Sequence, residues 1–351
     1  MNNAPMKTPL LLAFALCFSA AAPAQDKPGS EAFKKVTAAF SKGDKTAAFA
    51  AAKEGADAGD MECLLALGQM HEQGAGTAAD PAKAVDIYKQ AADKGSPAGM
   101  AAYALCLQEG KGVKADAEKA AFFIRKAAEA GHAVAQRSLG HAAERGYGQE
   151  VNLKSAREWF EKAAAQGEPE AMWRLSTYYK TGRAGLTKDA VKAAELCFEA
   201  ANRLSVPAMT QVAFNYRDGV GFKKDVVAAA GWFNFAAERG DAVAQYNLGL
   251  CYETGAGVVV DQAAAAALFG RAARQGDVDA AYRFGLCLRD GVGLKADRVG
   301  AFVALSVAAK AGHAEGVKAA EEVKKSLTPE ELKDAEKRQA PAAPAAKGKN
   351  P

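Results

Sequence analysis

Residues 255–261, GAGVVVD, have the glycines and the acidic residue of a phosphate-binding loop. Such a loop cradles phosphate on backbone N–H groups, and it needs a strand before it and Gly-Lys-Ser/Thr or a third glycine after it. The sequence lacks these later signals, and helix-forming residues lie on both sides. Related patterns also start elsewhere, at Gly74, Gly110, Gly146, Gly219 and Gly291. We therefore interpret the motif as repeated architecture and expect no nucleotide or other cofactor.

Other residues that could perform catalysis do not form a recognisable constellation. The chain has four histidines, and none belongs to a His-Glu-x-x-His pair; Cys-x-x-Cys pairs, Gly-x-Ser-x-Gly elbows and Ser-x-x-Lys motifs are absent from the sequence. These are the local signatures of zinc sites and of serine nucleophiles. His132 and His313 fall at predicted helix starts, which favours a structural role. We predict that the protein is not an enzyme and has no metal site.

The glycine motif recurs with a fixed period. The steps from Gly74 to Gly110 to Gly146, and from Gly219 to Gly255 to Gly291, are all 36 residues. Hydrophobic residues make up 50% of the chain but aromatic residues only 8%, and alanine, the best helix former, supplies much of the difference. We predict an all-α repeat array. Its seven units start at Asp60, Ser96, His132, Glu168, Ser205, Asp241 and Asp277.

Each unit predicts a first helix (helix A), a glycine turn and a second helix (helix B). The first residue of a unit, at offset zero, is the expected N-cap of helix A, and the first turn glycine is expected to end that helix in the left-handed conformation. The residue at offset 8, eight positions after the first residue of the unit, always has a small side chain, which would let helix B approach helix A closely. The acidic or amide residue after each turn is the expected N-cap of helix B. Helix B closes on glycine in six units, and Leu204 is the exception.

The pattern LGLCYETGAGVVVDQAAAAALFGRAARQG, residues 248–276, and its six relatives resemble the Sel-one-like repeat family, a branch of the tetratricopeptide-type helical repeats. The resemblance covers residues 60–312. It implies an α-solenoid, a right-handed superhelix of stacked helix-turn-helix units, used as a protein-binding scaffold and often found in bacterial envelopes. We expect roughly 16–18 helices, each held by stacking because isolated helices of this length are marginal in water.

The ends of the chain differ from the repeats. Residues 1–24 have the basic start, short apolar core and small-x-small cleavage site of a signal peptide, which predicts a periplasmic or secreted bacterial protein. Cys17 raises the alternative of a lipoprotein, but Leu16 before it is large for such a site. Residues 25–59 predict an N-terminal helical cap and residues 313–338 predict C-terminal capping helices. Residues 339–351 are rich in alanine, proline and lysine, and we expect a disordered tail.

The net charge of the chain limits the classes of partner that it can bind. A net charge of +4 is too small to indicate nucleic acid or an anionic membrane, and no stretch is long enough for membrane insertion. We expect a monomer.

Five cysteines follow the signal peptide, at 63, 106, 197, 251 and 287. Equivalent positions in stacked helices are about 8–10 Å apart, beyond the reach of a disulfide, so we expect most of these thiols to be free.

Helical periodicity predicts a binding surface on helix A. Offsets 4, 7, 11 and 14 cluster on one side and are the expected packed face, whereas offsets 2, 5, 9 and 12 fall opposite. In a tetratricopeptide-like superhelix that opposite side lines the inner groove. Aromatic residues with arginine neighbours are typical of interaction hot spots. We call the following set the A-helix stripe: Trp173, Lys180, Phe214, Arg217, Tyr246, Leu250, Glu253, Tyr282, Leu286 and Arg289.

The function predicted from these features is an exported scaffold that binds another protein or peptide through the A-helix stripe. One alternative is an envelope enzyme such as a cell-wall hydrolase, or a β-lactamase-like hydrolase of the kind named among cysteine-rich relatives. Another is a glycan or peptidoglycan binder that uses the aromatic residues. An enzyme is expected to interrupt the repeat with an insertion of convergent polar groups, and the insertion present is one residue near Gly185. A further possibility is that curvature buries the stripe against neighbouring A helices.

Overall fold

The computed structural model describes residues 29–147 and 150–339. Within these residues it contains 18 helices and no strand, in two compact units that divide after Asp189. Unit 1 holds α2 (Glu31–Ser41), α3 (Lys45–Asp57), α4 (Met61–Gln73), α5 (Pro81–Asp93), α6 (Pro97–Glu109), α7 (Ala117–Glu129), α8 (Ala133–Arg145), α9 (Leu153–Ala165) and α10 (Pro169–Thr181). Unit 2 holds α11 (Ala190–Asn202), α12 (Val206–Asp218), α13 (Val226–Glu238), α14 (Ala242–Thr254), α15 (Gln262–Arg274), α16 (Val278–Asp290), α17 (Arg298–Lys310), α18 (Ala314–Lys325) and α19 (Pro329–Gln339).

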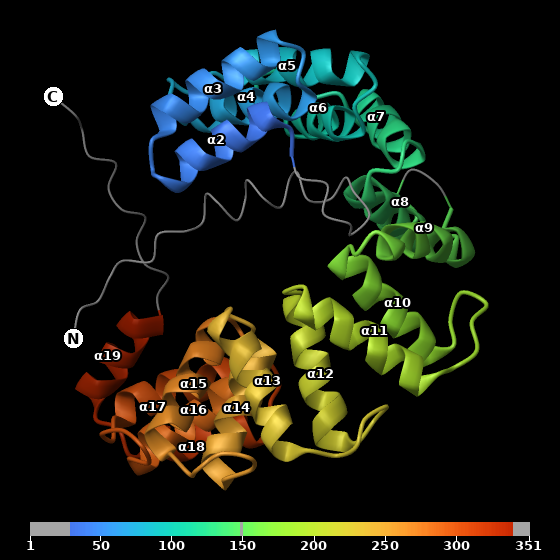
Figure 1. Cartoon of the computed structure of the whole chain (residues 1–351). Helices are drawn as coiled ribbons and strands as arrows, with labels where there is room; N and C mark the ends of the chain where they lie inside the picture. The colour runs from blue at the N-terminus through green and yellow to red at the C-terminus, as the bar shows by residue number, and fades with distance from the viewer. Residues whose placement is uncertain (1–28, 148–149, 340–351) are drawn as a thin grey trace, which may run out of the picture. The chain divides into compact units, whose positions relative to one another are not determined.

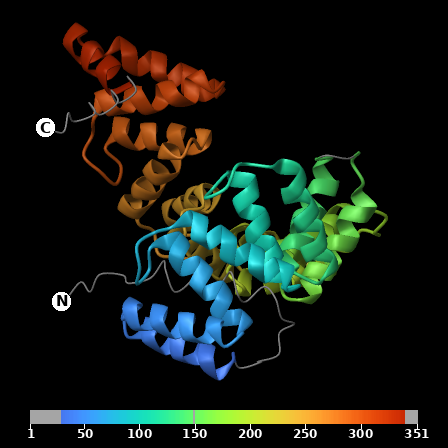
Figure 2. The same ribbon diagram turned by 90° about the horizontal axis from the view of Figure 1, so that it is seen from above.

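In each unit, helices that follow one another in the sequence pack side by side (Figure 1; Figure 2 shows the same succession from above). Helices α4, α6, α8, α10, α12, α14 and α16 are the A helices of the seven repeats, and the helix after each is its B helix. This succession of packed helix pairs confirms the predicted all-α solenoid fold. The described residues contain no helix with both the length and the apolar character needed to span a membrane.

Capping side chains fix where the helices begin and end. Offset zero is the N-cap of every A helix, and its side chain accepts a backbone N–H bond in six repeats, with Ser205 as the exception. The first turn glycine ends every A helix in the left-handed conformation, as predicted. The predicted N-caps of the B helices accept bonds from first-turn N–H groups at Asp80, Asp116, Asn152, Asp225, Asp261 and Asp297.

The small residue at offset 8 allows helix B to lie directly on helix A. A Cβ atom added to Gly249 would lie 2.6 Å from Cε1 of Phe269, a buried ring on the B helix of the same repeat. Gly140 stands in the same relation to Phe160, and Gly285 to Leu305. The ring or branched side chain occupies the space that a larger offset-8 residue would need. The predicted close approach of helix B is therefore confirmed in these repeats.

The packed face of helix A differs in part from the expectation. In α14 the buried residues are Ala244, Gln245, Leu248 and Gly249, at offsets 3, 4, 7 and 8. Offsets 4 and 7 are therefore packed as predicted, whereas offset 11, Tyr252, is half-buried. The buried face lies closer to the small offset-8 residue because contact with helix B requires a small side chain there.

Within the described residues, two helices precede the first repeat and two follow the last one. Helices α2 and α3 occupy the region predicted as an N-terminal cap, and α18 and α19 follow the last repeat. Thr328 and Glu331 form a capping box at the start of α19: the Glu331 backbone N–H donates to the Thr328 hydroxyl at 3.2 Å, and the Thr328 N–H donates to the Glu331 carboxylate at 2.8 Å. The predicted signal peptide and the tail from residue 340 lie outside the described residues.

Candidate binding surface

The A-helix stripe is divided between the two units. Trp173 and Lys180 lie on α10 in unit 1. The other eight members lie on three successive A helices of unit 2: Phe214 and Arg217 on α12, Tyr246, Leu250 and Glu253 on α14, and Tyr282, Leu286 and Arg289 on α16. Unit 2 therefore carries most of the predicted surface.

The stripe residues are neither buried in the core nor fully solvated. Lys180 and Arg217 are exposed, and the remaining eight are half-buried. Offsets 5, 9 and 12 lie opposite the predicted packed face of helix A, yet Phe214 and Tyr246 each contact a ring on the B helix of their own repeat. Their partial burial indicates that these side chains serve in packing and also leave surface open to a partner.

Phe214 and Arg217 form the first part of the stripe in unit 2. The Phe214 ring meets the buried Phe233 ring edge to face at a centroid distance of 5.2 Å. The Arg217 guanidinium carbon lies 4.7 Å from the Phe214 ring centroid, and its Nε pairs with Asp218 at 2.8 Å. Arg217 Nη1 also donates to Asn247 Oδ1 on the next A helix at 3.3 Å. The arginine is thus held over an aromatic ring while its side chain stays 46% exposed.

Tyr246 and Leu250 on α14 pack against the cluster around Phe269 and Cys287. The rings of Tyr246 and Phe269 have centroids 5.9 Å apart. Burial raises the pKa of the Tyr246 hydroxyl, with a further contribution from the negative charge of Asp279. Replacing Tyr246 with a small residue would therefore remove packing as well as surface.

The last part of the stripe contacts the C-terminal helices. The Tyr282 ring stacks on the His313 ring with centroids 4.4 Å apart, and both Tyr282 and Leu286 pack against the cluster that contains Leu305. Arg289 pairs with Asp290 at 2.7 Å. The surface of unit 2 therefore consists of half-exposed rings and aliphatic side chains edged by arginines that are paired with neighbouring acids.

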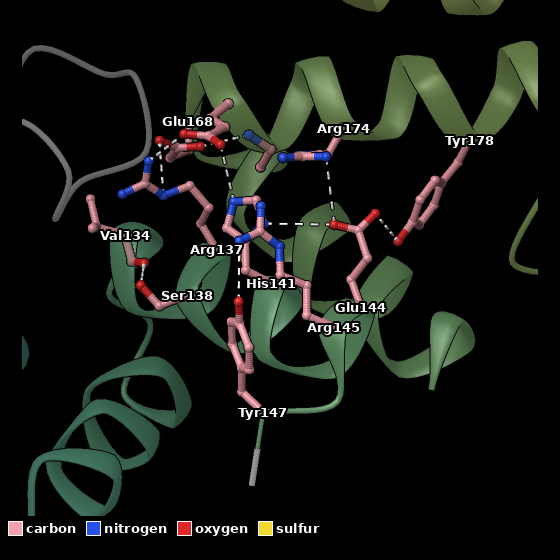
Figure 3. Close-up of polar contacts among 12 residues, drawn as sticks. Val134, Arg137, Ser138, His141, Glu144, Arg145, Tyr147, Glu168, Arg174 and Tyr178 are labelled. Atoms are coloured by element: carbon pink, nitrogen blue, oxygen red, sulfur yellow. Dashed lines mark hydrogen bonds and ion pairs between the residues drawn. The ribbon is translucent and has the colours of Figure 1, made fainter. Parts of the chain in front are cut away.

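The same offsets on α8 of unit 1 carry a different chemistry. Figure 3 shows Arg137, His141 and Glu144 from α8 facing charged and hydroxyl groups from the start and body of α10. We call this set, completed by Glu170, Arg174 and Tyr178, the α8–α10 polar cluster. His141 Nε2 lies 3.1 Å from Glu170 Oε1, and Arg137 Nη1 lies 2.8 Å from Glu170 Oε2.

The Glu170 carboxylate of the α8–α10 polar cluster is held in its charged form. The hydrogen bond from His141, aided by the charge of Arg137, lowers the pKa of Glu170 to about 2 although burial opposes this. Glu144 accepts a bond from the Tyr178 hydroxyl at 3.1 Å and lies 3.6 Å from Arg174 Nη1. Burial, aided by the Glu144 charge, raises the pKa of Tyr178. This arrangement links two successive A helices by charge pairs.

The α8–α10 polar cluster was not identified from the sequence. The signal that could have found it is the comparison of offsets 5, 9 and 12 between repeats: the third repeat has Arg137, His141 and Glu144 where the sixth has Tyr246, Leu250 and Glu253. The histidines at helix starts were interpreted correctly. His132 Nδ1 accepts the Ala135 N–H at 3.2 Å, and His313 Nδ1 accepts the Gly316 N–H at 2.9 Å.

None of the five described cysteines forms a disulfide within the described residues. Four are buried and Cys251 is half-buried. Burial raises the pKa of Cys63 to about 12 and that of Cys106 to about 11. These thiols therefore have the character of small apolar fillers between helices.

Comparison with known proteins agrees with the repeated architecture. The family model of the Sel1 repeat matches the chain seven times, at residues 62–96, 97–132, 133–168, 169–203, 206–241, 242–277 and 278–313. No curated protein matches the chain.

Two solved structures are similar over most of the chain. One is a protective antigen present in uropathogenic Escherichia coli strains that displays an SLR fold, with 26% identity and a TM-score of 0.71 over 88% of this chain and 67% of that chain. The other is a Sel1 repeat protein from Oxalobacter formigenes, with 27% identity and a TM-score of 0.58 over 85% of this chain and 95% of that chain.

Proposed function

Since the chain belongs to the Sel1 repeat family, we propose that it is an exported scaffold that binds another protein or peptide through the A-helix stripe. The family gives a helical-repeat solenoid whose general role is protein interaction. Beyond this general role, we propose that the binding surface is the part of the stripe on α12, α14 and α16. We also propose that the protein works in the periplasm or outside the cell. Export is supported by the signal-peptide pattern of residues 1–24.

The observation that carries the proposal is the composition of the three A helices in unit 2. Phe214, Tyr246 and Tyr282 each keep part of the ring at the surface while the rest is fixed by packing on a helix behind it. Rings held in this way lose little conformational entropy when a partner covers them, and such residues dominate binding energy at protein interfaces. Arg217 and Arg289 edge the rings with donors that can bond a partner's carbonyl or carboxylate groups.

The α8–α10 polar cluster supports a binding scaffold rather than an enzyme. Its carboxylates, Glu144 and Glu170, are engaged by Arg174, Tyr178, His141 and Arg137. A general acid or base needs a pKa near the working pH, and the pKa of Glu170 is instead lowered to about 2. The cluster is therefore better suited to holding α8 and α10 together than to transferring protons.

The proposal is tested by charge reversal and crosslinking rather than by removing the aromatic residues, because Tyr246 also contributes packing. The Arg217→Glu, Arg289→Glu double variant changes the stripe, and Arg203→Glu, Arg274→Glu makes the same charge change at exposed positions outside it. A photoreactive amino acid at position 217 or, as a control, at position 274 is introduced in the full chain, and crosslinks are formed in intact cells.

We expect a discrete crosslinked partner from position 217 and none from position 274. The stripe double variant should lose capture of that partner by at least about tenfold, whereas the control double variant should retain it. Both double variants should melt within a few degrees of the wild type. Equal crosslinking at positions 217 and 274, or equal capture by the two double variants, would show that the stripe is not the binding surface. Cell fractionation tests export independently.

A further inference from the structure

A continuous chain of five aromatic rings joins α11, α12, the turn that follows α12, and α13 in unit 2. Tyr216 of α12 stacks on Phe222 of the following turn at 4.8 Å between ring centroids. Phe222 meets Phe198 of α11 at 6.0 Å, Phe198 meets Trp232 of α13 at 5.7 Å, and Trp232 meets Phe235 at 5.8 Å. We call these five residues the α11–α13 aromatic patch. It includes none of the A-helix stripe.

The internal repeat shows that two of these rings are exceptional. The position of Phe235 holds Gln90, Lys126, Lys162, Glu199 and Arg271 in five other repeats and Val307 in the seventh. The position of Phe198 holds Lys89 and Arg125 in the first two repeats. Solvated polar residues are thus usual where this region has phenylalanine, and Phe235 is 51% exposed. The fold does not require an aromatic residue at these sites, and an apolar patch of this kind on a surface usually marks a contact.

One end of the patch opens into a hollow with a positive edge. The hollow has a volume of about 440 Å³ and is lined by Tyr216, Phe222, Lys223, Lys224 and Asp225. Asp225 is engaged as the N-cap of α13, where its Oδ1 accepts the N–H groups of Val227 and Ala228, both at 2.9 Å. Lys223 and Lys224 are exposed and form no ion pair within the described part of the chain. The two ammonium groups are therefore available to an anionic ligand beside the stacked rings.

We propose that the α11–α13 aromatic patch is a second docking surface, and that its ligand is an extended protein segment with acidic residues next to an aromatic or large aliphatic side chain. The apolar side chain would lie against Trp232 and Phe235, and the carboxylates would pair with Lys223 and Lys224. Charge complementarity selects the acidic segment, because Lys223 and Lys224 form no ion pair with the residues that the structure describes, while the nearby Asp225 carboxylate is occupied. This surface does not depend on the function proposed for the A-helix stripe.

The test uses three fluorescein-labelled peptides of equal length and the full mature chain. The first peptide is EEFEELG, the second is KKFKKLG and the third is SSFSSLG. Fluorescence anisotropy gives the dissociation constant of each at low salt and at about 0.5 M salt. We expect the acidic peptide to bind at least about tenfold tighter than the neutral one, the basic peptide not to bind, and the acidic peptide to weaken as salt screens the lysines.

Two variants locate the binding. Lys223→Glu with Lys224→Glu should weaken the acidic peptide by at least about tenfold. Lys114→Glu with Lys295→Glu is the matched control, because both lysines occupy the turn position equivalent to Lys223 in other repeats. Phe235→Gln introduces the residue of the first repeat, Gln90, and should weaken both the acidic and the neutral peptide about fivefold or more without loss of helical circular dichroism.

Several results would overturn the proposal. It is wrong if the acidic peptide does not bind saturably, if the neutral peptide binds as well as the acidic one, or if the control double variant weakens binding as much as the Lys223, Lys224 variant. It is also wrong if sedimentation shows a wild-type dimer that Phe235→Gln converts to a monomer, since the patch would then be covered by a second copy. Loss of crosslinking from the A-helix stripe has no bearing on any of these results.

Discussion

Gly257, in the turn of the sixth repeat, lies directly against the backbone carbonyl of Val226, at the start of the B helix of the fifth repeat. A Cβ atom at position 257 would overlap that carbonyl. The second glycine of other turns has the same relation to the preceding B helix: Gly76 to Lys45, Gly112 to Pro81, Gly221 to Ala190 and Gly293 to Gln262. The second glycine of the repeated motif therefore provides contact between repeats.

Gly257→Ala should destabilise the protein well beyond the cost of its left-handed backbone. Gly257 and Gly276 have φ angles of +79° and +90°, but the space around Gly276 is open. Ala at either position carries backbone strain of about 1 kcal/mol. Only position 257 adds overlap with Val226, so we expect at least about 2 kcal/mol more there. Urea denaturation followed by circular dichroism compares the two variants, and equal losses would contradict the contact.

Gly249→Ala and Gly231→Ala should change stability in opposite directions, although both glycines lie within helices. Alanine is preferred over glycine in a helix interior by about 0.5–1 kcal/mol. An added Cβ meets nothing within 4 Å at Gly231, so that variant should gain most of this amount. At Gly249 the same atom would lie 2.6 Å from the buried Phe269 ring, and we expect a net loss of about 1–3 kcal/mol. The shift in melting temperature of each variant relative to the wild type gives the sign of its stability change.

Leu204→Gly should stabilise unit 2. Leu204 ends α11 at the position where six other repeats have glycine, and its φ angle of +68° is left-handed. Its side chain is 54% exposed, so little packing is lost on replacement. Relief of the strain should give about 0.5–1 kcal/mol. Leu204→Ala, which keeps a Cβ in the same conformation, is the control, and a similar gain in that variant would contradict the explanation.

His132 should make stability fall as pH falls below about 6.5. His132 is 5% exposed, and burial lowers the pKa of its imidazole to about 4 in the folded protein. In the unfolded chain this pKa is about 6.5. Above that pH both states are neutral and the contribution is fully present; between about 6.5 and 4 the unfolded state alone binds the proton. The loss should approach about 3 kcal/mol near pH 4.

The measurement is the urea midpoint of the wild type and of His132→Asn between pH 7.5 and 4.5. Asparagine can cap α8 as His132 does but does not titrate in this range. We expect the wild-type midpoint to decline more steeply with acid than that of the variant. Burial also lowers the pKa of His71, so part of the decline should persist in His132→Asn. Parallel curves would show that His132 does not contribute.

The cysteines of the mature protein should be free and slow to react. Thiol labelling of the denatured, unreduced chain should modify most of the five cysteines that follow the signal peptide. In the native state labelling should begin at Cys251, the half-buried one, because the other four are buried and the thiolate is the reactive form. A mass spectrum that shows two or more intramolecular disulfides would contradict this prediction.

The sequence allows the helix boundaries to be predicted well, because they depend on local chemistry. Asp261 caps α15 through bonds to residues two and three positions later, and Gly255 ends α14 by its own backbone conformation. Both effects act within one turn of helix and recur at a fixed period. Positions of this kind can be identified from a single chain by aligning it on itself.

The partial burial of the A-helix stripe could not be predicted in the same way. Helical periodicity places Tyr246 opposite the most buried face of α14, yet its ring contacts Phe269 and its hydroxyl is affected by Asp279 of the next repeat. Burial there depends on how helix B crosses helix A and on the side chains of the next repeat, which the periodicity of helix A alone does not determine. The ring chain through Phe198 and Phe222 was missed for a similar reason, because its members come from different elements that meet only after folding.

Where the second turn glycine meets the backbone carbonyl at the start of the preceding helix, this contact also determines which changes of chain length the protein can accept. If a whole 36-residue repeat is removed, the second turn glycine still faces a backbone carbonyl at the start of the preceding helix. If only a few residues are removed, a residue with a side chain takes the place of that glycine against the carbonyl. The one-residue insertion in the fourth repeat falls between the turn glycines, where Ala184 and Gly185 take left-handed φ angles of +58° and +75°. Growth or shortening of the array should therefore proceed by complete repeats, with variation in length confined to the turns.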